Sequence, residues 1–347
     1  MFNARSTLNG PTRTGRGRRA CGASGTRGYP LGGGAGYREV VRPTGSPVRH
    51  LDELLEALAG ARSGDTVYVA GDAVIECTER VYVEELVLEL TGGVTLASDR
   101  GIRGAPGGLI RSDTFATRPL IRVTGEDARV TGLRLQGPNP RQCLEHHSRS
   151  FREGHGGHSY YYKFPTSDGV QTEESRLRVD NCELAGWSHG AVYLAGGDGH
   201  RVQHCFIHHN QYQGLGYGVS HDRAGSLIEG NLFDANRHSI AGSGRPGSGY
   251  EARNNVELGR SLSHCFDMHG GRDRKDGTDV AGGWMHVHHN TFRAPGRRAV
   301  VIRGTPEDRA VIEHNWFHHR SEAGALRFEE HVVVRDNAWG RRDPAYG

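Results

Sequence analysis

An asparagine recurs in the same local context along the second half of this sequence. Each copy follows a short run of alternating apolar residues and precedes another apolar residue, as in 228–233, 287–292 and 312–317. Two earlier copies carry cysteine instead, so that the repeated position falls at Cys182, Cys205, Asn231, Asn255, Asn290, Asn315 and Asn337. The steps between these positions, 22 to 35 residues, indicate a solenoid of stacked coils.

The content of each repeat predicts short strands. Val, Ile and aromatic residues recur at period two, and no repeat contains a helix-length amphipathic stretch. Stacked coils lie about 4.8 Å apart, so an inward-turning asparagine can exchange amide hydrogen bonds with the next one. The pattern resembles the asparagine ladder of right-handed parallel β-helices, the pectate-lyase-like superfamily. We expect an all-β fold, a right-handed parallel β-helix solenoid of about ten or eleven coils over residues 65–340.

The beginning of the regular region predicts a capping element. Leu51, Leu54, Leu55 and Leu58 have helical spacing within residues 48–61, and an amphipathic helix there would cover the open first coil. Strand-like segments follow, at 66–69, 81–90, 94–97 and 109–110. We therefore expect an N-terminal capping helix ahead of the first strands.

The remaining organisation follows from composition. We expect a disordered Gly/Arg-rich leader at 1–45, a single β-helix domain at 46–340 with insertions at 136–166 and 270–283, and a tail at 341–347. The 52 glycines suit a fold that turns a corner every few residues. A net charge of +3 argues against a nucleic-acid partner, and no apolar stretch predicts a membrane partner. We expect a monomer or weak oligomer.

The six cysteines do not have the spacing of a secreted disulfide scaffold. Cys182 and Cys205 stand on adjacent coils, and buried thiols in a reducing compartment explain them. No signal-peptide pattern precedes residue 46. We expect a cytoplasmic protein, or a secreted one if the true start of the chain lies elsewhere.

Polar residues in the strand after each ladder turn predict the functional face. We align 266–269, 300–303 and 326–329 with 240–243, 215–218 and 191–194. The first and third columns are mostly apolar and must point inward, so the second and fourth point outward. The outward residues are Asp267, His269, Arg303, Arg327 and Glu329, to which earlier coils add Arg122, Gln171 and Glu173.

The segment Phe266-Asp267-Met268-His269 resembles the Phe-Asp-Pro-His motif of mannuronan C5-epimerases, β-helix enzymes whose Asp and His act on uronate residues. Met268 replaces the proline, and His264 stands where that family has tyrosine. The resemblance implies a carbohydrate substrate and a polysaccharide lyase or C5-epimerase.

Removing the proton α to a uronate carboxylate requires a base and a cation beside the carboxylate. We assign the base to His269, oriented by Asp267, and the planar donors to Arg303 and Arg327. The insertion at 136–166 predicts a substrate-binding wall, and one of its tyrosines could serve as the acid. The residues concerned are Tyr160, Tyr161, Tyr162 and Lys163.

Three other functions remain open. A glycoside hydrolase or glycosyl-transferring β-helix enzyme would use carboxylates such as Glu173, Asp267 and Glu329. A metal-dependent enzyme would use the histidines, and the third alternative is a carbohydrate-binding rod without turnover. We expect no required cofactor.

Two groups of residues have the character of metal ligands. The insertion has a ligand-like spacing of Cys143, His146, His155 and His158, which is a weak prediction of a divalent metal. His286 and His288, with Glu313 one coil on, offer a second place for a surface ion. Most of the other histidines lie next to the ladder and are interpreted as polar turn residues.

Overall fold

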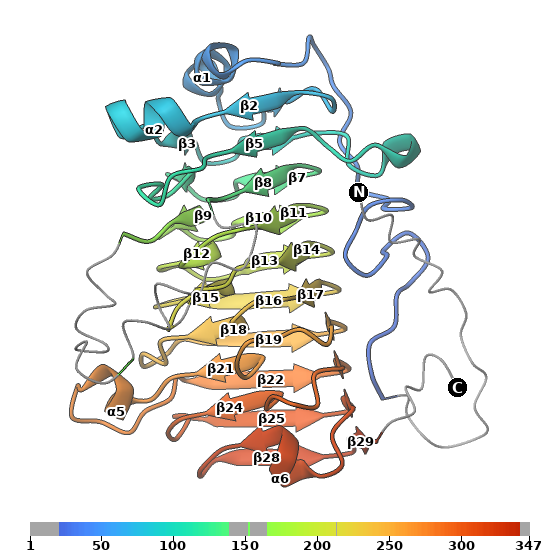
Figure 1. The fold of residues 1–347 in the computed structure, drawn as a ribbon, viewed down its shortest axis with the longest axis vertical. Helices are drawn as coiled ribbons and strands as arrows, with labels where there is room; N and C mark the ends of the chain where they lie inside the picture. Colours follow the sequence, from blue (N-terminus) through green and yellow to red (C-terminus); the bar gives the residue numbers. More distant parts are fainter. Residues whose placement is uncertain (1–20, 139–151, 153–164, 213, 341–347) are drawn as a thin grey trace.

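The computed structural model describes residues 21–138, 152, 165–212 and 214–340. These residues wind into a right-handed parallel β-helix, in which each regular coil adds one strand to each of three parallel sheets (Figure 1). The sheets hold ten, ten and nine strands, which confirms the predicted fold class and a count of about ten coils. The third sheet lies on the left in Figure 1, on the side of α5.

The first sheet contains β1 (Thr66–Tyr68), β4 (Thr95–Ala97), β7 (Arg129–Thr131), β10 (Arg178–Asp180), β13 (His200–Gln203), β16 (Gly225–Glu229), β19 (Gly249–Arg253), β22 (Trp284–His288), β25 (Arg309–Glu313) and β28 (Val332–Arg335). The second sheet contains β2 (Val74–Glu76), β5 (Leu109–Arg111), β8 (Arg134–Gln136), β11 (Glu183–Ala185), β14 (Phe206–His208), β17 (Leu232–Asp234), β20 (Val256–Glu257), β23 (Thr291–Phe292), β26 (Trp316–Phe317) and β29 (Ala338–Trp339).

The third sheet contains β3 (Leu88–Leu90), β6 (Ile121–Val123), β9 (Asp168–Thr172), β12 (Gly190–Leu194), β15 (Tyr217–His221), β18 (His238–Gly242), β21 (Phe266–Met268), β24 (Val300–Ile302) and β27 (Leu326–Arg327). The helices are short: α1 (Leu51–Gly60), α2 (Thr78–Glu84), the 3-10 turn η1 (Ile102–Gly104), α5 (Gly271–Arg274) and α6 (Glu322–Ala325).

Helix α1 caps the first coil as expected, because it buries Leu54 and Leu58 against the open end of the apolar interior. The strand expected at 81–90 is wrong in its first half. Residues Thr78–Glu84 form α2 and only Leu88–Leu90 form a strand. Val81 is the one residue of α2 that is buried. The apolar residues there therefore bury a single side chain of a helix and do not alternate between the two faces of a strand.

The asparagine ladder is confirmed. The backbone N and the side-chain Nδ2 of Asn255 both donate to Oδ1 of Asn290 at 3.0 Å, and the same pair of bonds links Asn231 to Asn255, Asn290 to Asn315 and Asn315 to Asn337. The residue before each ladder position has a positive φ in every coil from Asn181 to Asp336. Gly, Asn, Asp and His occupy these positions, in keeping with the tolerance of Gly, Asn and Asp for this conformation.

A second, shorter ladder escaped the sequence analysis. Nδ2 of Asn210 donates to Oδ1 of Asn236 at 2.8 Å, and Oδ1 of Asn210 accepts from the backbone N of Trp187 at 2.9 Å. Both asparagines are fully buried, in the connection between the second and third sheets. This ladder steadies the turn that leads into the candidate site.

One charged residue lies inside the aromatic column of the second sheet. The register places Glu257 between Phe233 and Phe292, and the stack continues with Phe317, whose ring centroid is 5.0 Å from that of Phe292. Glu257 accepts a hydrogen bond from Ser239 and is otherwise surrounded by the core. Burial raises the pKa of its carboxyl to about 8, because the charged form loses its hydration there.

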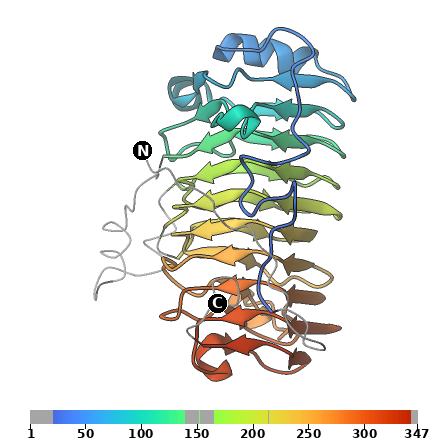
Figure 2. The same ribbon diagram turned by 90° about the vertical axis from the view of Figure 1, so that its right-hand side faces the viewer.

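The segment 21–48 runs along the side of the rod past the ladder turns (Figure 2). Its backbone N–H groups donate to the coils from Gly22 to His314 O and from Gly32 to Gly230 O, and Tyr37 donates its hydroxyl to Asp180 at 2.7 Å. The expected disorder of the leader 1–45 is therefore wrong for residues 21–45, while residues 1–20 lie outside the described residues. The segment packs close because a Cβ on Gly33, which has φ +68°, would lie 2.1 Å from a backbone oxygen.

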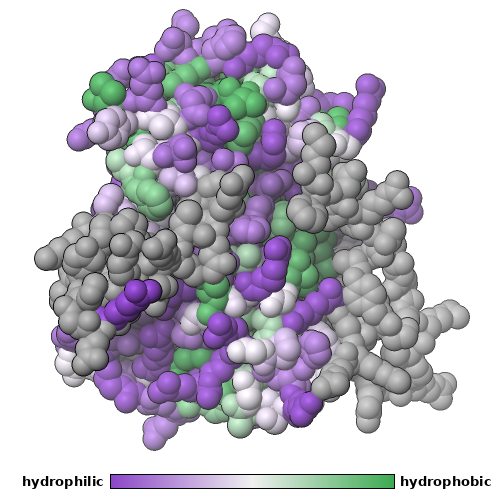
Figure 3. Space-filling view, viewed as in Figure 1, coloured by the Kyte–Doolittle hydropathy of each residue, from purple (hydrophilic) through white to green (hydrophobic). Residues whose placement is uncertain are grey.

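The surface of the described residues is mainly polar. Figure 3 shows hydrophilic residues over most of the described part of one face, with hydrophobic residues in small areas. Two of the exposed large apolar side chains, Tyr82 and Val83, belong to α2. Within the described residues, no helix combines the length and the apolar character needed to span a membrane. Cys182 and Cys205 are buried free thiols, as expected, and Cys143 lies outside the described residues.

The ladder makes a stability prediction. Asn290→Ala removes one amide that bonds to both neighbouring coils, and it leaves the buried backbone N–H of Asn255 without its acceptor. We expect the variant to lose about 1–3 kcal/mol of unfolding free energy in urea denaturation. His318→Ala, outside the ladder, is the control, and equal midpoints for the two variants would contradict the role given to the ladder.

Glu257 makes a pH prediction. Between the unfolded pKa of about 4.3 and the folded value of about 8, the folded state keeps a proton that the unfolded state has released. Stability conferred by the neutral carboxyl therefore falls as the pH rises, by on the order of 1.4 kcal/mol per pH unit at most. Glu257→Gln mimics the protonated form, so the variant should match wild type near pH 4.5 and exceed it near pH 8 in urea unfolding. Parallel pH profiles would refute this prediction.

Candidate functional site

The carboxylate of Asp267 is the centre of the candidate site. Phe266 and Met268 on either side of it fill the core, so the alternation of β21 sends Asp267 to the other face of the third sheet. Its neighbours in register are Ala241 and Val301, as the sequence predicted. The side chain is nevertheless fully buried, because groups from adjacent coils cover it.

One guanidinium and three imidazoles surround this carboxylate. Arg303 binds both oxygens, with Nε 3.0 Å from Oδ1 and Nη2 2.6 Å from Oδ2. The Nε2 atoms of His264 and His269 lie 3.1 and 3.0 Å from the carboxylate, and that of His238 lies 3.7 Å away. These residues come from three consecutive coils, so their meeting depends on the register of the solenoid.

The electrostatics follow from this arrangement. Burial by itself would raise the pKa of Asp267, but the hydrogen bonds from His264 and His269 and the charges beside it hold the pKa well below its usual range. The same carboxylate raises the pKa of Arg303 against the opposing effect of burial. Asp267 is therefore a fixed anion and a poor proton donor.

His238 forms the floor of the cluster. Its Nδ1 bonds to the backbone oxygen of His264, and the two imidazole rings lie 4.1 Å apart. Burial, followed by the positive charge of Arg237, holds the pKa of His238 well below its usual range. The ring of Tyr217 stacks on the other side at 5.7 Å.

Helix α5 supplies a second carboxylate. Oδ2 of Asp273 lies 3.5 Å from Nδ1 of His269 and 3.6 Å from Nη1 of Arg303. The chain reaches this position through Gly270, where a Cβ would lie 2.1 Å from the backbone oxygen of Arg303. A larger residue would push α5, and Asp273 with it, away from Arg303.

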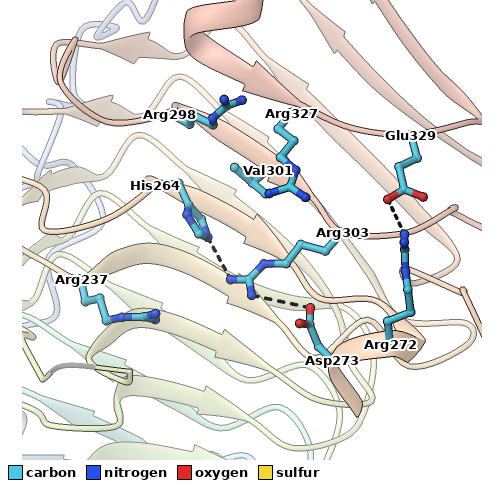
Figure 4. A pocket seen from close by; sticks show the side chains of 9 residues that line it. All are labelled: Arg237, His264, Arg272, Asp273, Arg298, Val301, Arg303, Arg327 and Glu329. Carbon is cyan, nitrogen blue, oxygen red and sulfur yellow. Dashed lines mark hydrogen bonds and ion pairs between the residues drawn. The ribbon is translucent and has the colours of Figure 1, made fainter. Parts of the chain in front are cut away.

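An open pocket of about 490 Å³ adjoins the cluster (Figure 4). It is lined by Arg237, His264, Arg272, Asp273, Arg298, Val301, Arg303, Arg327 and Glu329. Five guanidinium groups thus face two carboxylates, which leaves an excess of positive charge. Glu329 is paired with Arg272, and Asp273 lies beside Arg303.

Three of these arginines keep donors for a ligand. Nη1 of Arg237 is buried and has no hydrogen-bond partner among the described residues. Arg298 makes one bond from Nη1, to the backbone oxygen of Leu326 at 3.1 Å. Arg327 makes no ion pair with any residue that the structure describes, and Figure 4 shows it extending beside Val301 over the pocket.

The structure brings together most of the residues predicted in the later coils. Asp267, His269 and Arg303 form one hydrogen-bonded group, and Arg327 and Glu329 line the pocket beside it. His269 is bonded to Asp267 and is not among the described residues that line the pocket. The pocket-facing imidazole is that of His264, which differs from the expectation for His269.

The residues predicted from earlier coils are remote from the pocket. Gln171 shares the outward column of Asp267, but four coil steps separate them, roughly 19 Å at the usual spacing. Arg122 is one coil further and pairs with Glu89, and Glu173 is exposed near Gln171.

The alignment of two earlier strands was also wrong. The residues opposite Ile240 are Val219 and, one coil before, Val192. The expected alignment placed Leu215 where the structure has Val219, four residues too early, and Ala191 where it has Val192, one residue too early. Local apolar patterns in the two strands fit more than one register, and the backbone pairing selects one.

Eight predicted residues cannot be placed. Tyr160, Tyr161, Tyr162 and Lys163 lie outside the described residues, as do Cys143, His146, His155 and His158. Their assignments as substrate and metal ligands stay predictions.

The sequence analysis missed His238, His264, Asp273, Arg237 and Arg298 as site residues. Arg237, His264 and Arg298 lie in the turn before a strand of the third sheet, where no strand alternation assigns a direction, and His238 is the first residue of β18. One signal was available: Arg237-His238 and His264 stand at the beginning of successive strands of one sheet, which places them on neighbouring coils.

The cluster also has the atoms for a metal ion. Ligand atoms of His238, His264 and Asp267 lie within 4.8 Å of one another. However, Arg303 already binds both oxygens of Asp267, and its Nη2 lies 3.0 Å from Nε2 of His264. A cation at this position would have to displace a guanidinium, so the geometry favours the ion pair.

Comparisons with known proteins agree with the fold. The family described as "Right handed beta helix region" matches residues 166–326. An alginate lyase from Paenibacillus sp. str. FPU-7 superposes with a TM-score of 0.60 at 13% identity, over 84% of this chain and 94% of that one. The Family 28 exopolygalacturonase of Yersinia enterocolitica superposes with a TM-score of 0.47 at 11% identity, over 87% of this chain and 64% of that one. No curated protein matches the sequence.

Asp267 makes a stability prediction. Asp267→Asn removes the fully buried charge that binds both Nε and Nη2 of Arg303, so we expect a loss of about 3–5 kcal/mol at pH 7. Because the folded pKa is lowered, the contribution of Asp267 is present above the unfolded pKa of about 3.9 and is lost as the pH falls through the folded value. Urea unfolding measures it, with the more exposed Asp273→Asn as the matched control; equal stability of the two variants would contradict the prediction.

Proposed function

We propose that the protein is a carbohydrate-active enzyme that removes the proton α to the carboxylate of a uronate residue, in a poly- or oligosaccharide. The observation that carries the proposal is the pocket, in which five guanidinium groups outnumber two carboxylates beside a buried cluster of histidine and aspartate. Such a pocket favours an anionic substrate and has an imidazole at its wall.

The arginines divide into two roles. Asp267 binds the guanidinium group of Arg303 and so fixes this group beside the imidazole of His264. Arg237, Arg298 and Arg327 have free donors and would bind the uronate carboxylate, with planar pairs of hydrogen bonds. Neutralising the carboxylate stabilises the negative charge that develops on it when the α-proton leaves.

His264 is the proton acceptor in this proposal, in place of His269. The Nε2 atoms of both imidazoles face Asp267, but the imidazole of His264 lines the pocket and that of His269 is not among the described residues that do. Histidine takes up and releases protons readily near neutral pH. Asp267 would stabilise the imidazolium that forms, as a positioning residue that does not contact the sugar.

Two outcomes can follow proton removal. If the bond from C4 to its oxygen breaks, the product has a double bond conjugated with the carboxylate, and the leaving oxygen takes a proton. If a proton returns to the opposite face of C5, the product is the epimer. The tyrosines at 160–162 stay the predicted source of that proton.

The alginate lyase with the same fold is, by its name, an enzyme that acts on a polyuronate. This agrees with the proposal, which is argued from the pocket. A hydrolase using Asp273 and Glu329, which both line the pocket, is less well supported, because Glu329 is paired with Arg272 and Asp273 lies beside Arg303.

The proposal is tested by incubating the protein with polymers and oligomers of mannuronate, guluronate, galacturonate and glucuronate in D₂O. Elimination is detected by the ultraviolet absorbance of the conjugated double bond, and epimerisation by deuterium at C5 in NMR spectra. New reducing ends without either signal would establish hydrolysis and overturn the proposal, as would a lack of turnover on the whole panel.

The role of His264 is tested on the substrate found in this way. We expect His264→Gln to reduce kcat by about 10²- to 10⁴-fold, the usual effect of losing a positioned base. His269→Gln should reduce it less, since His269 acts through Asp267. His318→Ala, outside the pocket, serves as the control. A larger loss of kcat in His269→Gln than in His264→Gln would restore His269 as the base.

A further inference from the structure

A second cluster of histidine and glutamate lies on the first sheet, outside the pocket of the third sheet. Strand β22 carries His286 and His288 with one residue between them, so both side chains leave the same face while Met285 and Val287 fill the core. In register with His286, the preceding coil has Glu251, and in register with His288 the following coil has Glu313. Two imidazoles and two carboxylates therefore meet on three consecutive coils.

Two short contacts join these groups in pairs. Nε2 of His288 lies 3.0 Å from Oε1 of Glu251, and Nε2 of His286 lies 3.1 Å from Oε1 of Glu313. The two imidazole rings are stacked at 4.1 Å. The ligand atoms of Glu251, His286 and His288 all lie within 4.8 Å of one another.

The ligand atoms of Glu251, His286 and His288 are close enough to share one metal ion, and Glu313, outside that set but 3.1 Å from His286, would act as the fourth ligand by rotating toward it. Zinc binds imidazole nitrogen and carboxylate oxygen at about 2.0–2.2 Å, which places neighbouring ligand atoms about 3.4 Å apart. Small rotations of the side chains would open the present 3.0 and 3.1 Å contacts to that value. The exposed fractions of the His286 and Glu251 side chains, 38% and 29%, leave a path for an ion from solvent.

The surroundings orient the ligands. Nδ1 of His288 lies 2.8 Å from Nδ1 of His289, so one hydrogen bond fixes the ring from behind. Arg335 donates a hydrogen bond to Oε2 of Glu313, and the other oxygen, Oε1, faces His286. Nη1 of Arg253 donates to Oε1 of Glu251 at 2.9 Å, the oxygen that faces His288, but both oxygens of Glu229 also bind Arg253 and would keep it paired if an ion took Oε1. Neither arginine bonds to an imidazole nitrogen, in contrast to Arg303 in the pocket cluster.

We propose that Glu251, His286, His288 and Glu313 form a binding site for one divalent transition-metal ion of the zinc type, which ties β19, β22 and β25 together. Two carboxylates and two imidazoles match the ligand preference of zinc. Four protein ligands leave no position for a substrate, so the site is structural and independent of the activity proposed for the pocket.

The experiment uses the full chain after treatment with a chelator. Titration with Zn²⁺ by calorimetry should show one ion bound per chain, and Co²⁺ should give the visible absorption of a tetrahedral site. His286→Ala and His288→Ala should each weaken Zn²⁺ binding by more than the ~10- to 100-fold that loss of a residue behind the ligands costs. Added Zn²⁺ should raise the Tm of wild type and leave that of His286→Ala unchanged.

His264→Ala, which disrupts the other metal-compatible cluster, is the matched control and should bind Zn²⁺ as wild type does. Binding that survives His286→Ala and His288→Ala, or that is lost in His264→Ala alone, would place the ion elsewhere and overturn the proposal. Absence of binding up to millimolar Zn²⁺ would also overturn it. Glu251→Gln keeps the shape of the side chain and removes its charge, so it provides the same test if the histidine variants fold poorly.

Discussion

The register of one coil on the next is the constraint on which every other feature of this molecule depends. The ladder amides enforce it, because each asparagine donates both its backbone N–H and its side-chain NH₂ to the next Oδ1. A slip by one residue would turn every side chain of a strand to the opposite face and leave these buried groups unpaired. The backbone pairing of three sheets then carries the same register around the coil. The side chains of His264 and Arg303, 39 residues apart in the sequence, meet only because this register holds.

The surroundings of Asp267 show how the register of the coils assembles the candidate site. A buried carboxylate is expensive to desolvate, and removal of its partners would leave an uncompensated charge. Arg303, His264 and His269, from two adjacent coils, bond to it, and His238 of a third coil packs 3.7 Å away, so the charge is stable only in the correctly stacked solenoid. The same arrangement fixes Arg303 and the imidazole of His264 at the wall of the pocket before any substrate arrives. The arginines that do not bind Asp267 stay available for an anion, which is the division of roles that proton abstraction requires.

The sequence predicted the ladder, the capping helix and the later coils of the third sheet because these depend on local alternation and a regular period. It placed Asp267, Arg303 and Arg327 in the right columns for the same reason. It failed where position depends on the path of a turn: His264 precedes its strand and His238 is the first residue of β18, so no period-two pattern gave their direction. It also treated an outward side chain as an exposed one. Asp267 points away from the core and is still fully buried, because long side chains from neighbouring coils close over it.

Two titratable clusters thus arise on two sheets from the same alternation, and the placement of arginine distinguishes their chemistry. In the pocket of the third sheet, Arg303 binds both carboxylate oxygens and reaches an imidazole nitrogen, so the cluster is saturated with positive charge. On the first sheet, Arg253 and Arg335 bind only the carboxylates, and the imidazole nitrogens face carboxylate oxygens. An anion is favoured beside the first arrangement and a cation within the second. On this repeating scaffold, the ligand that a histidine cluster favours therefore depends mainly on the residues one coil away from the histidines.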